Sequence, residues 1–138
     1  MILVVNTADK NACLGLYDKK ILAEIGWEAA RNLSGDILNE LNKLFVQSGI
    51  KVSEITGIIV CSGPGSFTGL RIGISVANTL AYSLDVPIVG VTGEINFLEL
   101  CKKGNNLIKK EEKGFGVSVE PFYGSEPNVT LHKQKITK

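Results

Sequence analysis

Cys61-Ser-Gly-Pro-Gly-Ser-Phe-Thr-Gly-Leu-Arg-Ile-Gly73 is the stretch that decides the fold of this chain. It follows Ile58-Ile-Val60, an apolar run typical of a buried strand. The glycines and proline at positions 63–65 predict a sharp turn, and Ser66 stands where the N-cap of a helix is expected. Backbone N–H groups at a helix N-terminus favour negative charge, so a phosphate site is one interpretation. A plain connection between strand and helix is the other.

A second polar turn, Asn6-Thr-Ala-Asp9, follows the first apolar run of the chain. A turn between the first two strands can hold a phosphate, but an asparagine at its start is more typical of an ordinary Asx-type turn. The candidates for contact with a phosphate or nucleotide are therefore Asn6, Thr7, Gly63 and Gly65.

The segment from Phe67 to Leu84 predicts a helix that is buried over most of its circumference, because its polar residues form one narrow stripe. The stripe consists of Arg71, Ser75, Asn78 and Tyr82. Small residues recur at every fourth position and form a smooth ridge, which consists of Gly69, Gly73, Ala77 and Ala81. Two glycines inside a helix cost about 1 kcal/mol each relative to alanine. We therefore expect a close neighbour at this ridge: the sheet, the other helix, or a partner chain.

The other periodic segments predict an α/β lobe. Strands are expected at residues 2–5, 12–17, 21–27, 57–61 and 87–91, and further helices at 35–48 and 94–103. Ser34 is expected to cap the helix at 35–48 and Gly49 to end it. Its apolar side chains share one face that packs on a sheet, and they are Ile37, Leu38, Leu41, Leu44 and Phe45. Gly104 is expected to end the helix at 94–103.

A hairpin, helix, strand, helix and strand in this order predict a mixed sheet with helices packed on it. This is the pattern of one lobe of the actin/Hsp70/sugar-kinase class (ASKHA, ribonuclease H-like), whose members normally enclose a nucleotide between two lobes. We expect residues 1–104 to form the lobe and residues 105–114 a charged linker. Residues 115–138 are expected to form an extended or β tail, with strands at 115–120 and 128–134.

Composition excludes several function classes. The 138 residues carry 15 Lys and Arg against 14 Asp and Glu, and no basic cluster is interleaved with aromatic residues, so direct RNA binding by this chain alone is disfavoured. No run is long enough to span a membrane. The three cysteines lie far apart, which is typical of reduced thiols in a cytoplasmic protein. A single histidine, His132, provides neither a zinc site nor a histidine-based catalytic triad.

The motif Gly63-Pro-Gly-Ser-Phe-Thr-Gly-Leu-Arg-Ile-Gly73, followed by Pro87-Ile-Val-Gly-Val91, resembles the signature of the TsaB (YeaZ) family. That family supplies a non-catalytic subunit of the bacterial complex that makes N6-threonylcarbamoyladenosine (t6A) in tRNA. The resemblance covers residues 1 to about 100, and the tail from Val119 to Thr130 is similar to a C-terminal segment of the family. The chain departs from the family at Asn6-Thr-Ala8, where members usually have Asp-Thr-Ser. Members are also generally longer, with a second lobe.

The resemblance implies a scaffold that activates a TsaD-type catalytic subunit and is joined by a TsaE-type ATPase. Pairing with a second copy is implied when the chain is alone, and contact with tRNA only through the complex. The resemblance implies no catalytic residue, metal or cofactor in this chain, with ATP or ADP only at an interface with a partner. The interface residues it implies are Ser66, Phe67, Gly69, Leu70, Arg71, Gly73, Ile74, Ala77, Asn78, Ala81, Leu41 and Phe45. The alternative function is a small ATP-binding or phosphate-binding enzyme lobe of the same fold class.

Overall fold

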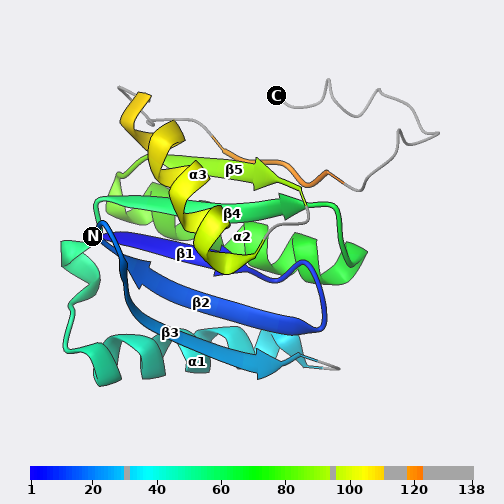
Figure 1. Ribbon diagram of the computed structural model, residues 1–138. Coiled ribbons are helices and arrows are strands. Elements are labelled where there is room, and N and C mark those ends of the chain that lie inside the picture. Colours follow the sequence, from blue (N-terminus) through cyan, green and yellow to red (C-terminus); the bar gives the residue numbers. More distant parts are fainter. Residues whose placement is uncertain (30–31, 94–95, 111–117, 123–138) are drawn as a thin grey trace.

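The computed structural model describes residues 1–29, 32–93, 96–110 and 118–122. Its strands form one mixed sheet, and helices flank that sheet (Figure 1). In chain order they are β1 (Ile2–Asn6), β2 (Asn11–Tyr17), β3 (Ile21–Glu28), α1 (Leu33–Ser48), the short 3-10 helix η1 (Val52–Glu54), β4 (Gly57–Gly63), α2 (Phe67–Leu84), β5 (Ile88–Thr92) and α3 (Phe97–Lys110).

The sheet has the strand order β3-β2-β1-β4-β5. Strands β1, β2 and β3 are antiparallel neighbours, whereas β4 is parallel to both β1 and β5. The hairpin and the parallel strands on either side of α2 confirm the fold class that the sequence predicted. All of β4 is buried, as its continuous apolar sequence indicates for a central strand.

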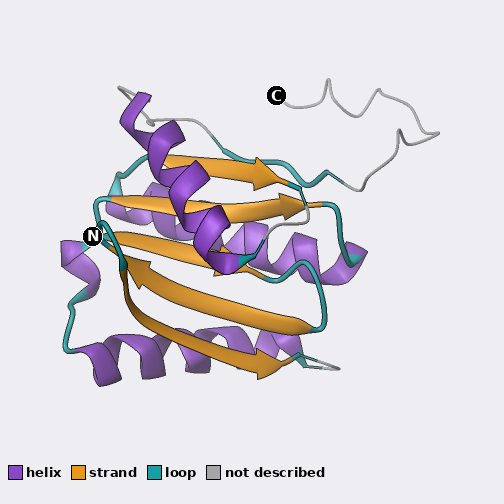
Figure 2. Cartoon of the chain, in the orientation of Figure 1, coloured by secondary structure: helices purple, strands orange, loops and turns teal. Residues whose placement is uncertain are grey.

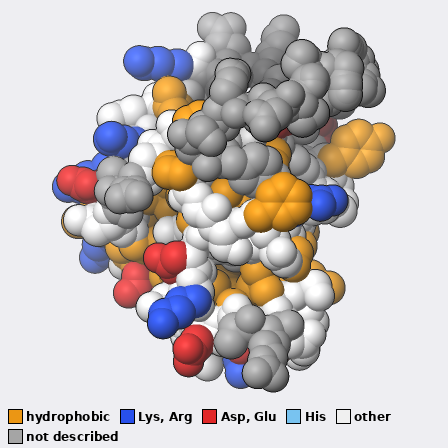
Figure 3. All heavy atoms as spheres, turned by 90° about the vertical axis from the view of Figure 1, so that its right-hand side faces the viewer, with side chains coloured by type: hydrophobic (Ala, Val, Ile, Leu, Met, Phe, Trp, Pro, Cys, Tyr) orange, Lys and Arg blue, Asp and Glu red, His pale blue; other side chains and the backbone are white. Residues whose placement is uncertain are grey.

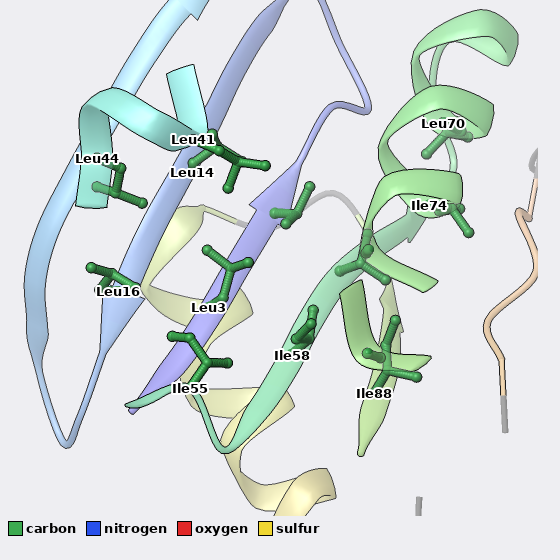
Figure 4. Close-up of a cluster of buried hydrophobic side chains, with 14 residues drawn as sticks. Leu3, Leu14, Leu16, Leu41, Leu44, Ile55, Ile58, Leu70, Ile74 and Ile88 are labelled. Atoms are coloured by element: carbon green, nitrogen blue, oxygen red, sulfur yellow. The ribbon is translucent and has the colours of Figure 1, made fainter. Parts of the chain in front are cut away.

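Helices cover both faces of the sheet, with α1 and α2 on one face and α3 on the other (Figures 1 and 2). Alternate residues of each strand point to opposite faces, so Ile58 and Val60 pack towards α2 while Ile59 and Cys61 pack towards α3. In Figure 4 the leucine and isoleucine side chains of the α1/α2 face point towards one another from strands β1, β2, β4 and β5 and from helices α1 and α2. This cluster is the largest of the hydrophobic clusters among the described residues, and it packs both helices on the sheet.

Helix α2 has the limits that the sequence predicts. The Ser66 side chain accepts a hydrogen bond from the Gly69 N–H at 3.1 Å, which confirms the expected N-cap. The predicted cap of α1 is wrong, because the helix begins at Leu33 and Asn32 takes the N-cap position without a side-chain hydrogen bond. Gly49 ends α1 as predicted, with a φ of 75° that favours glycine.

Helix α3 corrects the prediction that Gly104 ends it. The helix continues to Lys110, and Gly104 is buried where an added Cβ would lie 2.6 Å from Ile59 Cδ1. The glycine therefore serves close packing of α3 on β4, and this tertiary contact overrides the local stop signal. Residues 105–110, expected in a linker, belong to the helix, and residues 111–114 lie outside the described part. No helix among the described residues is long and apolar enough to cross a membrane.

Residues 118–122, which we call the strap, lie against the lobe as an irregular segment. The predicted strand at 115–120 is therefore wrong for residues 118–120, whereas residues 115–117 and the strand expected at 128–134 lie outside the described part. The Phe122 N–H donates to the Ser62 carbonyl at 2.6 Å, next to the end of β4. In Figure 1 the strap, drawn in orange, runs beside β5.

Two thiols on the α3 side of the molecule predict a pH-dependent stability. Burial, with a smaller contribution from the Glu24 carboxylate, raises the pKa of Cys13 from 9.0 to about 12 and that of Cys101 from 9.0 to about 11. Below pH 9 these thiols are protonated in both states and their contribution to stability is fully present. Above it the unfolded thiols ionise first, so the free energy of unfolding falls until the pH passes the folded values.

Urea unfolding at a series of pH values between 8 and 12 measures this loss. A variant carrying both Cys13→Ala and Cys101→Ala serves as the control, because it removes these two thiols and keeps every other ionisable group. We expect its free energy of unfolding to fall less steeply with pH than that of the original chain. Equal slopes contradict the prediction.

Candidate functional site

The surface that α1 and α2 turn away from the sheet is the candidate site. Four large apolar side chains on these helices are exposed, namely Leu38 (61%), Val46 (70%), Phe67 (56%) and Tyr82 (84%). Figure 3, which views the right-hand side of Figure 1, shows hydrophobic side chains reaching the surface beside a basic one. Exposed apolar groups on two adjacent helices make these helices the candidate for a protein–protein contact.

A groove of about 740 Å³ runs along α2. Its lining includes Ile37 and Leu38 of α1, Arg71 and Ser75 of α2, and Pro121 of the strap. We call it the α2 groove. Most of its side chains are apolar or uncharged, and Arg71 is the one charged residue among those that line it in the described part of the chain.

Arg71 lies over the ring of Phe67, with 5.2 Å between the guanidinium carbon and the ring centroid. Among the described residues the one salt bridge joins Lys43 to Glu40, so no described carboxylate pairs with Arg71. When a guanidinium stacks on an aromatic ring, its N–H groups can still bind a carboxylate that lies in the plane of the guanidinium. The groove can therefore accept an apolar surface that carries one acidic group.

The small-residue ridge of α2 does have a close neighbour, but that neighbour is the chain itself. The Thr7 hydroxyl donates to the Gly69 carbonyl at 2.7 Å, and Thr7 Oγ1 occupies the place that a Cβ on Gly73 would need. The assignment of the ridge to a partner interface is corrected, because its residues are buried in the lobe. The predicted interface residues that are buried in this way are Gly69, Leu70, Gly73, Ile74, Ala77, Ala81 and Leu41.

The remaining predicted interface residues reach the surface to different degrees. Phe67 and Arg71 are exposed, while Phe45 is half-buried beside a small apolar cavity between the C-terminal halves of α1 and α2. Ser66 is exposed but acts as the cap of α2. Asn78 is half-buried, and its side-chain amide is bonded to the strap.

Sequence reasoning missed parts of this surface. It placed Leu38 on the packed face of α1, yet the side chain is mostly exposed, because it lies at the edge of the apolar face. Tyr82 was identified as a member of the polar stripe but not as a site residue. Val119 and Pro121 enter the site through tertiary packing, for which the sequence holds no local signal.

Most of the residues predicted to contact a phosphate instead bond to or pack against other parts of the same chain. Thr7 is buried and its hydroxyl bonds to α2, while Asn6 Oδ1 accepts the Ala8 N–H at 3.0 Å in an Asx-type turn. The Ala8 carbonyl in turn accepts the Ser66 N–H at 2.6 Å and lies where a Cβ on Gly65 would be. These contacts favour the interpretation of the glycine-rich turn as a connection between strand and helix.

A cleft of about 350 Å³ remains beside this turn, between the ends of β1 and β4. Asn6, Asp9 and Gly65 contribute to its lining, and Asp9 is the one charged residue among the described residues that line it. A carboxylate repels a phosphate, and the described lining of the cleft supplies no cation to bind an anion. Gly63, at the end of β4, has a φ of 129°, and the Phe122 carbonyl fills the space where its Cβ would be.

The described residues contain no group of three or more His, Cys, Asp or Glu placed to hold a metal ion.

Comparison with known proteins finds t6A-biosynthesis proteins by sequence and a YeaZ protein by structure. The model of the family TsaD, tRNA N6-adenosine threonylcarbamoyltransferase, matches residues 25–99. The tRNA threonylcarbamoyladenosine biosynthesis protein TsaB of Bacillus subtilis (strain 168) is 33% identical over 92 residues, which are 66% of this chain and 40% of that protein. TsaB of Buchnera aphidicola subsp. Schizaphis graminum is 28% identical over 92 residues, 67% of this chain and 44% of that protein.

Among solved structures, YeaZ from Pseudomonas aeruginosa superimposes with a TM-score of 0.61 at 27% sequence identity. The superposition covers 66% of this chain and 43% of that one. The chain thus spans about two-fifths of the length of the relatives it matches.

The contact between Thr7 and α2 predicts the effect of adding a methyl group at Gly73. Gly73→Ala places a Cβ on the Thr7 hydroxyl, so we expect it to lower the free energy of unfolding by about 1–3 kcal/mol despite the better helix propensity of alanine. Ser75→Ala, on the exposed side of the same helix, is the control and should stay within about 0.5 kcal/mol. Chemical denaturation measures both values. A Gly73→Ala variant as stable as the original chain contradicts the packing described here.

Proposed function

This chain belongs to the TsaB (YeaZ) family, and we propose that it is a non-catalytic subunit that binds a TsaD-type transferase in t6A biosynthesis. The observation that carries the proposal is the exposed apolar surface of α1 and α2, with the α2 groove and with Arg71, with which no carboxylate of the described residues pairs. Exposing such a surface to water is unfavourable, and burying it against a partner removes that cost.

The family match supports a partner with a related lobe. Residues 25–99, which match the transferase family model, include α1, β4, α2 and β5. Two chains built on the same lobe can pair through equivalent surfaces related by an approximate two-fold axis, as in an isologous dimer. We propose that α1 and α2 of this chain face the corresponding helices of the transferase, and that a second copy takes that place when the transferase is absent.

The other components follow from the same proposal. A TsaE-type ATPase joins the pair, tRNA is contacted through the complex, and ATP or ADP is bound only at an interface between subunits. The net charge of +1 supports indirect contact with tRNA, because a chain that binds RNA by itself generally carries a strong positive patch. The complex is proposed to act in the cytoplasm, where tRNA modification takes place.

Leu38→Glu tests the proposed surface. The side chain is 61% exposed, so the substitution should leave the stability of the lobe within about 0.5 kcal/mol. Burying a carboxylate in an apolar interface is unfavourable, and we expect the affinity for the purified TsaD-type subunit to fall about tenfold or more. Biolayer interferometry measures the affinity, and t6A formation on tRNA by the assembled complex should fall with it.

Leu98→Glu is the matched control, because Leu98 is an exposed leucine of α3 on the opposite side of the sheet. We expect its affinity for the transferase to match that of the original chain. If Leu98→Glu weakens binding of the transferase and Leu38→Glu does not, the interface lies on the α3 side of the sheet and the proposal is refuted.

Titration calorimetry with ATP and Mg²⁺ tests the alternative function of a nucleotide-binding enzyme lobe. Because Asp9 is the one charged group in the described lining of the cleft at the strand ends, we expect no saturable heat for the chain alone at millimolar ATP. Asp9→Asn, which removes the opposing charge, is the companion measurement. Saturable binding by the original chain, weakened when Asn6 is replaced by alanine, supports the alternative instead.

A further inference from the structure

The strap is tied to α2 by one side chain. The Asn78 Nδ2 group donates to the Val119 carbonyl at 2.9 Å, and Asn78 Oδ1 accepts the Val119 N–H at 2.9 Å. Both bonds go to backbone groups, so the amide pairs with the strap much as a neighbouring strand would. Val119, which is 41 positions away from Asn78 in the sequence, is held in this way. The Asn78 amide therefore cannot turn towards a partner without releasing Val119.

The lobe is shaped to receive the strap on its α2 face. A Cβ on Gly90 of β5 would lie 2.7 Å from Val119 Cγ1, so the valine side chain lies in the space that glycine leaves open. The Phe122 N–H donates to the Ser62 carbonyl, and the Phe122 carbonyl fills the space left by Gly63. These contacts at both ends fix the path of the strap relative to α2.

The strap shares the groove with the helices. Val119 and Pro121 line the α2 groove together with Arg71, Ser75 and Leu38. Pro121 is half-buried in the free lobe, and proline contributes an apolar surface of fixed backbone shape. The lining of the groove is therefore shared by α1, α2 and the strap.

We propose that the strap is part of the partner-binding surface, with Pro121 in contact with the partner and Asn78 as the positioning residue that holds the strap in place. This inference rests on the proposed function and extends it to a segment outside the two helices. The occupant of the groove is an amphipathic helix of the transferase-type partner. That helix turns an apolar stripe towards Leu38 and Pro121 and a carboxylate towards Arg71, because Arg71 is the one charged group in the described lining and has no described ion-pair partner.

Pro121→Glu in the full chain tests the contact. We expect about a tenfold loss of affinity for the TsaD-type subunit, with the Val119 amide as protected from hydrogen exchange as in the original chain. Glu120→Ala is the matched control, because Glu120 belongs to the strap but does not line the groove. It should bind with unchanged affinity.

Asn78→Asp tests the positioning role independently. The change removes the donor to the Val119 carbonyl and sets a carboxylate against it, so the Val119 amide should exchange faster in the free chain and the affinity for the partner should fall severalfold. Ser83→Asp adds the same charge at an exposed position of α2 outside the groove and should change neither readout.

The outcomes separate this inference from the proposed function. Loss of binding with Leu38→Glu, but original affinity with both Pro121→Glu and Asn78→Asp, overturns the role of the strap and leaves the helix surface standing. Original affinity with all three variants overturns the helix surface as well. Faster exchange at Val119 in Asn78→Asp with unchanged affinity also overturns the inference, because the released strap then makes no difference to the partner.

Discussion

The contact between Thr7 and the glycines of α2 is the constraint on which the outer surface of the lobe depends. Thr7 follows β1 directly, is buried, and donates to the Gly69 carbonyl, while Gly73 leaves room for its side chain. Helix α2 can lie this close to the end of β1 only because two of its turns lack side chains at the point of contact. That position turns Arg71 outward and brings Asn78 within reach of the strap.

Much of the fold could be predicted because its signals are local. The cap at Ser66, the left-handed residue at Gly49 and the apolar run of β4 each depend on a few neighbouring residues, and each was predicted correctly. The failures arise where tertiary contact decides. Gly104 fits the rule for a helix end, but it lies inside α3. The Ile59 side chain occupies the space that a side chain at position 104 would take. Only the packing of α3 on β4 distinguishes these two uses of glycine.

The candidate site could be predicted only in part, for a related reason. Small residues at every fourth position of α2 indicate a close neighbour but not which one, and here the neighbour is Thr7 of the same chain. Leu38 belongs to the apolar face of α1 by spacing, yet whether the edge of such a face is covered depends on the position of the next helix. The bond between Asn78 and Val119 involves backbone groups of the strap, which any residue type supplies.

The two sides of the sheet differ in a way that favours one of them for a partner. Helix α3 buries Leu100 and Cys101. It exposes Leu98 and Leu107, but also four lysines, at 102, 103, 109 and 110, which keep its outer surface hydrated. The surface of α1 and α2 exposes large apolar side chains, and Arg71 is the one charged residue in the described lining of its groove. A guanidinium is more weakly hydrated than an ammonium group, and this one already stacks on Phe67. Burying Arg71 therefore costs less than burying any of the α3 lysines, and a carboxylate on the partner can offset what remains.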